Sequence, residues 1–226
     1  FQYELLCASN QVASEKGSCE YYDRTKYAQG ILPIDTYKKD VDNIVPNELK
    51  CDWDKLRTNI KVHGLRHSTL TAQMPSESSS VVSNATNGVE PPRDYLSVKK
   101  SKKGTLKQVV PQYSILKNFY TLLWDMEDND GYIKTLAVMQ KFFDQAISGN
   151  WSYNPEKFVD GEVPVSVLAG DMLKTYKYGW KTSYYQNTMD GKTEDVVKDE
   201  NSAMNDYIPP MLDSPDSEED CDACAI

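Results

Sequence analysis

The chain has 226 residues, of which 39% are hydrophobic and 26% charged, and its formal net charge is -9 at pH 7. No apolar run approaches the roughly 18 residues that a membrane-spanning helix requires, which argues against a membrane protein. Residues 189–226 hold 12 Asp and Glu against 2 Lys, so residues 1–188 carry a net charge of only +1. A nearly neutral body with an acidic tail argues against nucleic-acid binding through a basic face, and the tail is typical of a solvated, disordered segment.

The five cysteines indicate the cellular compartment of the chain, and its first residue indicates that it is part of a longer protein. No signal peptide is recognisable, so the cysteines indicate a reducing compartment and a cytoplasmic protein, with Cys7, Cys19 and Cys51 as ordinary thiols. Initiator Met is normally removed only before a small residue. A chain that starts at Phe1 is therefore expected to be part of something longer, either a larger protein or one piece of a split enzyme.

Helical periodicity dominates the first 64 residues. A helix is expected over 1–16, a short one over 20–29, and another over 52–64 with Asp52 as its N-cap; each is followed by or ends at a Gly. The apolar face expected for the first helix consists of Phe1, Leu5, Ala8 and Val12. Residues 65–74 then alternate small polar and apolar side chains, which predicts a buried strand.

The middle of the chain begins with a polar loop. Residues 76–93 are rich in Ser, Asn and Gly and are expected to form a functional loop, and the segments 95–99 and 105–110 predict a hairpin. Apolar stripes then predict two helices, over 115–126 and 133–147. The acidic turn that joins these helices lacks the first and last ligands of a calcium loop and is expected to be a turn with an N-cap.

A helix from Pro164 to Gly179 and a strand over 181–187 complete the ordered part. From residue 189 onward Asp, Glu, Ser and Pro dominate. The sequence therefore predicts one domain over 1–188 and a flexible acidic tail over 189–226.

The tail ends in Cys221-Asp-Ala-Cys224-Ala-Ile226. This pair lies outside the folded core, so a disulfide between its cysteines would not stabilise that core. Zinc binding would need two further ligands that the tail does not supply. A tethered redox dithiol is the better interpretation. His63 and His67 likewise form no zinc pattern with the distant cysteines.

Two other segments are ambiguous by themselves. Five residues at the start of the polar loop place hydroxyl groups at a possible helix start, where backbone N–H groups and the helix dipole suit a phosphate; plain capping is the competing interpretation. These residues are Pro75, Ser76, Glu77, Ser78 and Ser79. The neighbouring tyrosines Tyr184 and Tyr185 equally suit ordinary sheet packing.

The order of the motifs carries more information than any one of them. The chain reads Gly64-Leu-Arg-His-Ser-Thr-Leu-Thr-Ala-Gln-Met-Pro-Ser-Glu-Ser-Ser-Ser80, then Ser83-Asn-Ala-Thr-Asn-Gly-Val-Glu-Pro-Pro-Arg93, then Tyr184-Tyr185-Gln-Asn-Thr188, then the terminal Cys pair. This closely resembles the C-terminal third of the large catalytic subunit of class I ribonucleotide reductase. The resemblance extends over residues 1–188 and resumes in the last six residues.

The resemblance implies an α/β fold: the C-terminal part of the family's ten-stranded α/β barrel, mostly helical here, with a few barrel strands, a hairpin and a disordered acidic tail. It implies reduction of ribonucleoside diphosphates to deoxyribonucleoside diphosphates by a cysteine thiyl radical. The segment from Pro75 to Ser79 matches the family's substrate phosphate site, and Tyr184 and Tyr185 match its radical relay. Cys221 and Cys224 match the tail thiols, which reduce the active-site disulfide and are themselves reduced by thioredoxin or glutaredoxin.

Three expectations follow from these matches. Adjacent residues of a regular strand point to opposite faces, so two consecutive relay rings require an irregular backbone near Tyr184. The roughly 32 tail residues before Cys221 give a flexible chain an r.m.s. span near 30 Å, enough to swing into a cleft. The helix from Pro164 resembles the family's docking element for the small subunit's C-terminal peptide and offers Leu168 and Met172.

The thiyl cysteine and the active-site redox pair belong to family segments that precede residue 1. The partners implied are therefore the N-terminal part of the large subunit, the small radical-generating subunit, thioredoxin or glutaredoxin, and a ribonucleoside diphosphate. No cofactor is expected in this chain; the small subunit's dinuclear metal and tyrosyl radical, and nucleotide effectors on the N-terminal part, serve the whole enzyme. The alternative is a non-catalytic assembly module that docks the small subunit.

Overall fold

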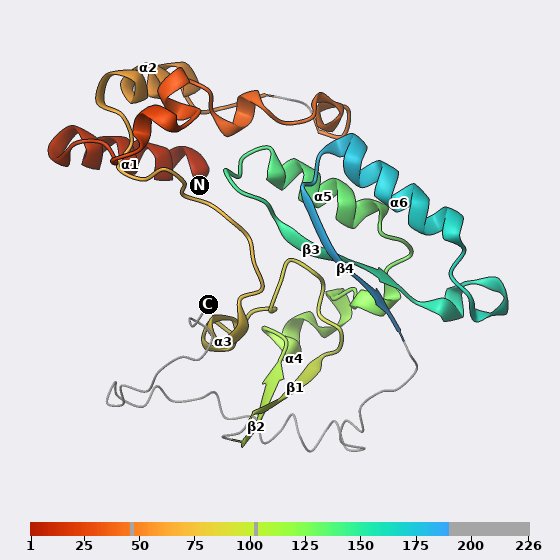
Figure 1. Cartoon of the computed structure of the whole chain (residues 1–226). Coiled ribbons are helices and arrows are strands. Elements are labelled where there is room, and N and C mark those ends of the chain that lie inside the picture. The colour runs from red at the N-terminus through yellow and green to blue at the C-terminus, as the bar shows by residue number, and fades with distance from the viewer. Residues whose placement is uncertain (46–47, 102–103, 190–226) are drawn as a thin grey trace.

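The structure is a computed structural model that describes residues 1–45, 48–101 and 104–189. Over these ranges helices and short 3-10 turns predominate, and the strands form two separate two-stranded sheets. Figure 1 shows an N-terminal helical group with α1 and α2, a central pair of strands flanked by α5 and α6, and a hairpin beside α3 and α4. The mixed α and β content agrees with the sequence, but the described residues form no closed barrel, so the ten-stranded barrel stays a prediction.

The N-terminal group is built on α1 (Gln2–Lys16) and α2 (Trp53–His63), and both predicted helices are confirmed. The Asp52 carboxylate accepts a hydrogen bond from the Lys55 N–H at 3.0 Å, which makes Asp52 the N-cap as expected. Leu6 of α1 and Ile60 of α2 are completely buried in the core between them.

The predicted apolar face of α1 is wrong, because Phe1 is 88% exposed. The buried residues of this helix are Gln2, Leu6, Ser9, Asn10 and Ala13. Asn10 explains the rotation: its side-chain amide donates to the carbonyl oxygens of Asn59 and Gly64, at 3.1 and 2.8 Å. A polar side chain that satisfies the end of α2 therefore turns inward.

The helix predicted over 20–29 is also wrong. The chain forms two 3-10 turns, Tyr22–Arg24 and Tyr27–Gln29, separated by the extended residue Thr25. The Thr25 hydroxyl donates to the Tyr22 carbonyl at 2.6 Å, a local bond that competes with helix formation. Further 3-10 turns follow at Pro33–Asp35 and Lys39–Asn43.

The strand predicted over 65–74 is reduced to a single parallel bridge between Gln73 and Ile147. The reason is Asp144, whose carboxylate accepts hydrogen bonds from the N–H groups of Leu70 and Thr71 at 2.6 and 3.2 Å. A side chain thus takes the place of a neighbouring strand along this part of the segment.

The polar loop and the hairpin follow the prediction closely. A short helix, α3 (Glu77–Val82), opens within residues 76–93. The antiparallel strands β1 (Leu96–Ser101) and β2 (Gly104–Val109) then pair in register, from Leu96 opposite Val109 to Ser101 opposite Gly104.

The helix predicted over 115–126 breaks into three pieces: α4 (Tyr113–Leu116) and the 3-10 turns Lys117–Phe119 and Leu123–Asp125. Its apolar stripe is not a buried face, since Phe119 is 82% exposed. The chain instead extends at Tyr120, and Leu123 donates its N–H to the Pro92 carbonyl at 2.9 Å. A tertiary contact with the polar loop therefore overrides the helical periodicity.

The next helix, α5 (Asp130–Gln140), is confirmed at its start but ends seven residues early. The Gln140 side chain causes this end, because it donates to the Gln145 carbonyl at 2.7 Å and accepts from the Ile147 N–H at 3.1 Å. The chain then forms β3 (Ser148–Tyr153), a strand that the sequence did not predict. The apolar residues up to Ile147 therefore lead into a sheet.

The last helix and strand are confirmed as α6 (Val165–Tyr178) and β4 (Thr182–Thr188). Gly179 ends α6 in the left-handed region, with φ 83°, a conformation that favours Gly. β4 pairs in parallel with β3. The buried core beside these strands comes from α5, from β3 and from residues shortly before β3 and β4. Its members are Tyr132, Ile133, Leu136, Ile147, Trp151, Tyr153 and Trp180.

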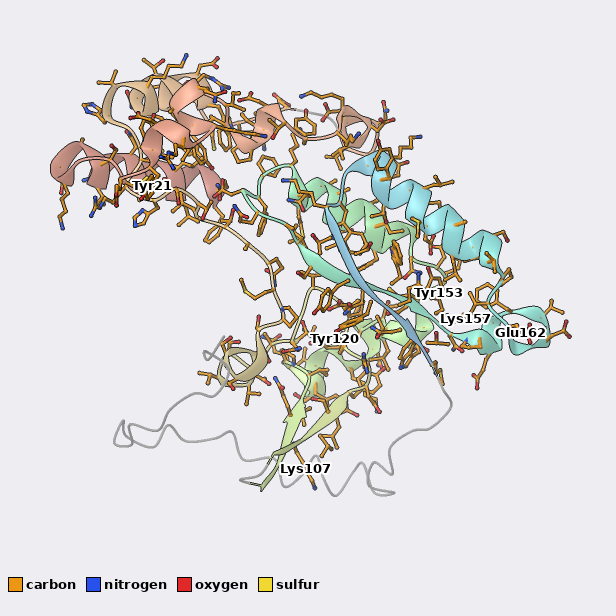
Figure 2. The ribbon with its side chains drawn as sticks, viewed as in Figure 1. Tyr21, Lys107, Tyr120, Tyr153, Lys157 and Glu162 are labelled. Atoms are coloured by element: carbon orange, nitrogen blue, oxygen red, sulfur yellow. The ribbon has the colours of Figure 1, made fainter. Side chains whose placement is uncertain are left out.

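A buried polar network attaches α6 to β3. The Asp171 carboxylate, 5% exposed, accepts from the Asn129 side-chain amide at 3.0 Å and from the Tyr153 hydroxyl at 3.1 Å. Tyr153 lies toward the end of β3 (Figure 2). Burial and then the Asp171 charge raise the pKa of Tyr153, so its hydroxyl keeps its proton and remains a donor.

Asp171→Ala is expected to lower the free energy of unfolding by about 3 kcal/mol, because it leaves two buried donors without an acceptor. Urea denaturation of the chain measures this change. The neighbouring Met172 is 55% exposed, so Met172→Ala is the control, with an expected change within about 0.5 kcal/mol. Equal losses in the two variants would contradict the importance of the network.

Among the residues that the structure describes, no helix combines the length and the apolar character needed to cross a bilayer.

Candidate functional site

Strand β4 is irregular at the tyrosine pair. Ser183 lies opposite Gly149 of β3, but Gln186 lies opposite Trp151, so Tyr184 and Tyr185 together face the single residue between them on β3. The β-bulge brings the two rings to a centroid distance of 4.2 Å with an interplanar angle of 59°. The predicted irregular backbone is therefore confirmed, and it places consecutive phenol rings in contact.

Both phenol rings are accessible, at 56% exposure for Tyr184 and 59% for Tyr185. Hydrogen bonding to the Tyr184 phenol raises the pKa of Tyr185 above its ordinary value, and the Coulomb interaction with Tyr184 adds to this. An ordinary tyrosine phenol, with a pKa of about 10, already keeps its proton at neutral pH, and so does Tyr185. Oxidation of this ring to a neutral radical requires loss of that proton together with an electron.

Two residues that the sequence did not single out hold the bulge. The Asn150 side-chain oxygen accepts from the Tyr185 N–H at 3.1 Å, and its side-chain NH2 donates to Glu90 Oε1 at 2.8 Å. The Asn150 backbone N–H donates to the same Glu90 oxygen at 3.0 Å. Asn150 lies on the strand that was missed, so no sequence pattern marked it. Glu90 lies inside the family motif over 83–93, but nothing in that motif indicated its contact with Asn150.

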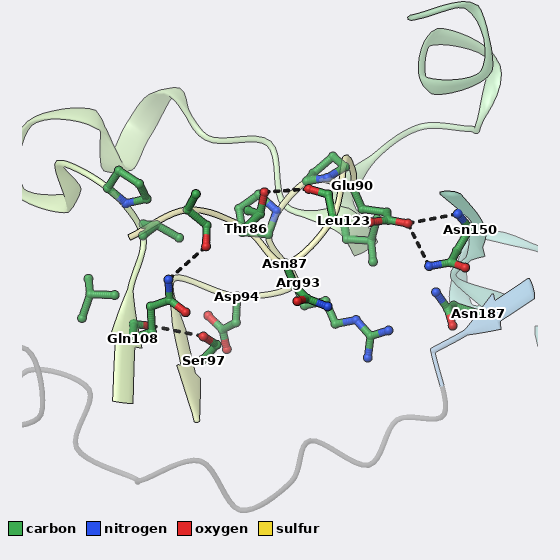
Figure 3. A pocket seen from close by; sticks show the side chains of 17 residues that line it. Thr86, Asn87, Glu90, Arg93, Asp94, Ser97, Gln108, Leu123, Asn150 and Asn187 are labelled. Carbon is green, nitrogen blue, oxygen red and sulfur yellow. Dashed lines mark hydrogen bonds between the residues drawn. The ribbon is translucent and has the colours of Figure 1, made fainter. Parts of the chain in front are cut away.

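A cavity of about 260 Å³ opens beside this contact. Its wall comes from the loop that follows α3, from the hairpin and from the paired strands, including Glu90, Arg93, Gln108, Asn150 and Asn187 (Figure 3). The site is thus an open hollow that joins the polar loop to the paired strands at Asn150 and Asn187, and Asn150 contacts the Tyr185 backbone.

The predicted phosphate segment lies at the start of α3. Ser76 is the N-cap residue, but its side chain does not cap the helix, whereas the Ser79 hydroxyl donates to the Ser76 carbonyl at 2.5 Å. Ser78 and Ser79 are exposed. The Ser76 N–H donates to the Asn87 carbonyl at 2.6 Å, which ties this segment to the loop that lines the cavity.

The remaining candidate residues are cysteines and a histidine. Cys221 and Cys224 fall outside the described residues. Cys7, Cys19 and Cys51 are free thiols. His67 accepts or donates a hydrogen bond with the Ser9 hydroxyl at 3.0 Å, a structural contact.

No group of three or more His, Cys, Asp or Glu residues within the described ranges could hold a metal ion.

Residues 1–186 match the family described as the barrel domain of ribonucleotide reductase, which covers most of the chain. The chain belongs to this family.

Curated relatives of this ribonucleotide reductase chain are also similar in sequence. It is 59% identical over 198 residues to the ribonucleoside-diphosphate reductase subunit alpha of Haemophilus influenzae, covering 88% of the chain and 26% of that protein. It is 55% identical over 212 residues to ribonucleoside-diphosphate reductase 1 subunit alpha of Escherichia coli, covering 94% and 27%. The subunit alpha of Enterobacteria phage T4 is 43% identical over 227 aligned residues, covering 100% of the chain and 28% of the phage protein.

The chain thus spans about a quarter of the length of the curated relatives that it matches. The match to the phage protein extends over the tail, which includes both terminal cysteines.

Proposed function

We propose that this chain supplies the C-terminal part of a class I ribonucleotide reductase large subunit that reduces ribonucleoside diphosphates to deoxyribonucleoside diphosphates. The observation that carries the proposal is the bulge in β4, which places the phenol rings of Tyr184 and Tyr185 in contact in a member of this family. Overall, one ribonucleotide and one dithiol yield one deoxyribonucleotide, one disulfide and one water.

The tyrosine pair is the relay of the radical. Tyr185 loses an electron and its phenolic proton to an oxidised partner, and it then takes an electron and a proton from Tyr184. The contact between the two rings supports this coupled transfer, because it places the two phenols within hydrogen-bonding reach of each other. The small subunit supplies the radical from its dinuclear metal and tyrosyl radical, and the thiyl cysteine belongs to the remainder of the large subunit.

The segment from Pro75 to Ser79 binds the substrate phosphates. Exposed hydroxyl groups at the start of α3 support this role, since hydroxyl and backbone N–H donors at a helix start suit an anion. Cys221 and Cys224 then return two electrons to the active-site disulfide, and thioredoxin or glutaredoxin reduces the tail. Nucleotide effectors act on the remainder of the subunit.

A reconstitution experiment tests the proposal. The chain is mixed with the remainder of a large subunit, the small subunit, an effector nucleotide and thioredoxin, and deoxyribonucleoside diphosphate formation is measured. We expect product only when the chain is present. A non-catalytic assembly module would instead allow the same rate with redox-inactive and relay-inactive variants of the chain.

Helix α6 is proposed to dock the C-terminal peptide of the small subunit, through Met172 as expected from the sequence but without Leu168. Leu168 packs against the core and is unsuitable. The exposed apolar residues of α6 are Val165, Met172, Leu173 and Tyr176. Their spacing forms a stripe along the helix that an apolar peptide can cover.

Met172→Asp is expected to weaken binding of the small subunit at least about tenfold, because a carboxylate in an apolar interface loses hydration without gaining a partner. Surface plasmon resonance with the assembled large subunit measures this affinity. Val62 of α2 is 70% exposed on another helix, so Val62→Asp is the matched control. Unchanged affinity for Met172→Asp would remove α6 from the interface.

A further inference from the structure

The bulge in β4 is held by a side-chain hydrogen bond, in addition to the backbone hydrogen bonds between the strands and the contact between the tyrosine rings. An extra residue in one strand leaves its backbone groups without a partner on the opposite strand. Here the N–H of Tyr185 finds its acceptor in a side chain, the Asn150 amide oxygen at 3.1 Å. The conformation of the tyrosine pair therefore depends on how the Asn150 amide is oriented.

Glu90 fixes that orientation. A carboxylate only accepts hydrogen bonds, so the side of the Asn150 amide that faces Glu90 Oε1 at 2.8 Å must be its NH2 group. The amide oxygen must then face Tyr185. The Asn150 backbone N–H donates to the same Glu90 oxygen at 3.0 Å, so the carboxylate holds the main chain and the side chain together (Figure 3).

Two neighbours keep Glu90 in place. The Tyr132 hydroxyl donates to Glu90 Oε1 at 3.4 Å, and burial raises the pKa of Tyr132, so this group stays a donor. Gly88 leaves room for the carboxylate, because a Cβ atom at this position would collide with Glu90 Oε2. Glu90 therefore reaches Asn150 from a loop that is also tied to the start of α3 through the Ser76 N–H and the Asn87 carbonyl.

We infer that Glu90 and Asn150 are positioning residues that hold the bulge in β4 and thereby keep the Tyr184 and Tyr185 rings in contact. Asn150 acts on the Tyr185 backbone directly, and Glu90 acts only through Asn150. Their importance to catalysis rests on the relay role proposed above for the tyrosine pair.

Hydrogen exchange of the Tyr185 amide tests the positioning role without turnover. In the full chain assembled with the remainder of the large subunit, Asn150→Leu should raise the exchange rate of this amide about tenfold, because one hydrogen bond is lost. Amides of α2, which is remote from β4, should be unchanged. If Asn150→Leu raises exchange everywhere, Asn150→Ser is used in its place, since its hydroxyl is too short to reach the Tyr185 N–H.

A double-mutant cycle tests whether Glu90 acts through Asn150. Glu90→Leu should raise Tyr185 exchange by itself and add nothing in the Asn150→Leu background. Glu90→Gln keeps an acceptor oxygen and should restore exchange to within about twofold of the unaltered chain. Unchanged Tyr185 exchange in Asn150→Leu, or additive effects in the double variant, would overturn the inference.

Steady-state kinetics separate this role from the relay itself. Asn150→Leu should lower kcat for nucleotide reduction and leave the substrate KM unchanged, because Asn150 contacts the relay backbone and not the substrate segment. If the tyrosines proved dispensable, the relay proposal would fail while the exchange results still decided whether Asn150 holds the bulge. If exchange changed and kcat did not, Asn150 would hold the bulge as described, but its importance to radical transfer would be overturned.

Discussion

Replacing either tyrosine of the pair with Phe is expected to abolish nucleotide reduction in the assembled enzyme. Phe keeps the ring and its packing but has no phenolic proton to release, so it cannot be oxidised at a comparable potential. We expect kcat to fall at least about a thousandfold, which corresponds to about 4 kcal/mol of lost transition-state stabilisation. Formation of deoxyribonucleoside diphosphate, measured with saturating small subunit, checks this result.

The matched control is a tyrosine of the same chain that lies outside the bulge. Tyr21 is 56% exposed, the same as Tyr184, but lies beside the N-terminal helices (Figure 2). Tyr21→Phe should therefore leave the rate unchanged. The two relay variants should still bind substrate and small subunit with unaltered affinity. Rates above about one tenth of the unaltered enzyme for either variant would contradict a relay that passes through both rings.

The helices that could be predicted from the sequence are those whose ends are set by local chemistry. Asp52 supplies a capping carboxylate for α2, and Gly179 ends α6 in the left-handed region. These signals act over one helical turn and need no knowledge of the rest of the fold. The hairpin was predictable for the same reason, because its turn and its alternation are both local.

The elements that could not be predicted are those decided by particular side-chain hydrogen bonds to the backbone. Asp144 takes over two N–H groups of the expected strand at Leu70 and Thr71, and Gln140 ends α5 early. Neither contact has a signature in a single sequence. Apolar periodicity therefore suggested a helix where the chain in fact turns into β3.

The candidate site also contains one part that could be predicted from the sequence and one part that could not. The tyrosines could be proposed from their family motif, and the need for an irregular strand followed from the alternation of side chains in β structure. The pairing of Glu90 with Asn150 could not be predicted, because 60 positions separate them in the sequence and only the fold brings their side chains together. A motif can thus include a positioning residue such as Glu90, but only the contacts in the fold show what that residue positions.

Replacing Cys221 or Cys224 is expected to have the second large effect, which is on the rate of repeated turnover and not on the first turnover. We expect Cys224→Ser to lower the thioredoxin-supported rate at least about a hundredfold, because exchange with a buried disulfide requires both tail thiols: one attacks, and the other releases the mixed disulfide. Two electrons then have no route from thioredoxin to the active site. A pre-reduced enzyme should still complete its first turnover, as a rapid-quench measurement would show.

The reductant distinguishes a tail that carries electrons from a tail that only supports the fold. A small dithiol such as dithiothreitol can enter the cleft itself, so it should restore steady turnover to Cys221→Ser and Cys224→Ser but should not restore either relay variant. Cys51 is an exposed free thiol of the described part, and Cys51→Ser is the control, which should turn over at the unaltered rate with either reductant. If the small dithiol failed to rescue the tail variants, the loss would lie in the chemistry of reduction or in folding, and the electron-carrier role of the terminal cysteines would be wrong. Rescue confined to these two variants would separate the two tasks of the chain, with radical transfer at the bulge in β4 and disulfide reduction at its terminus.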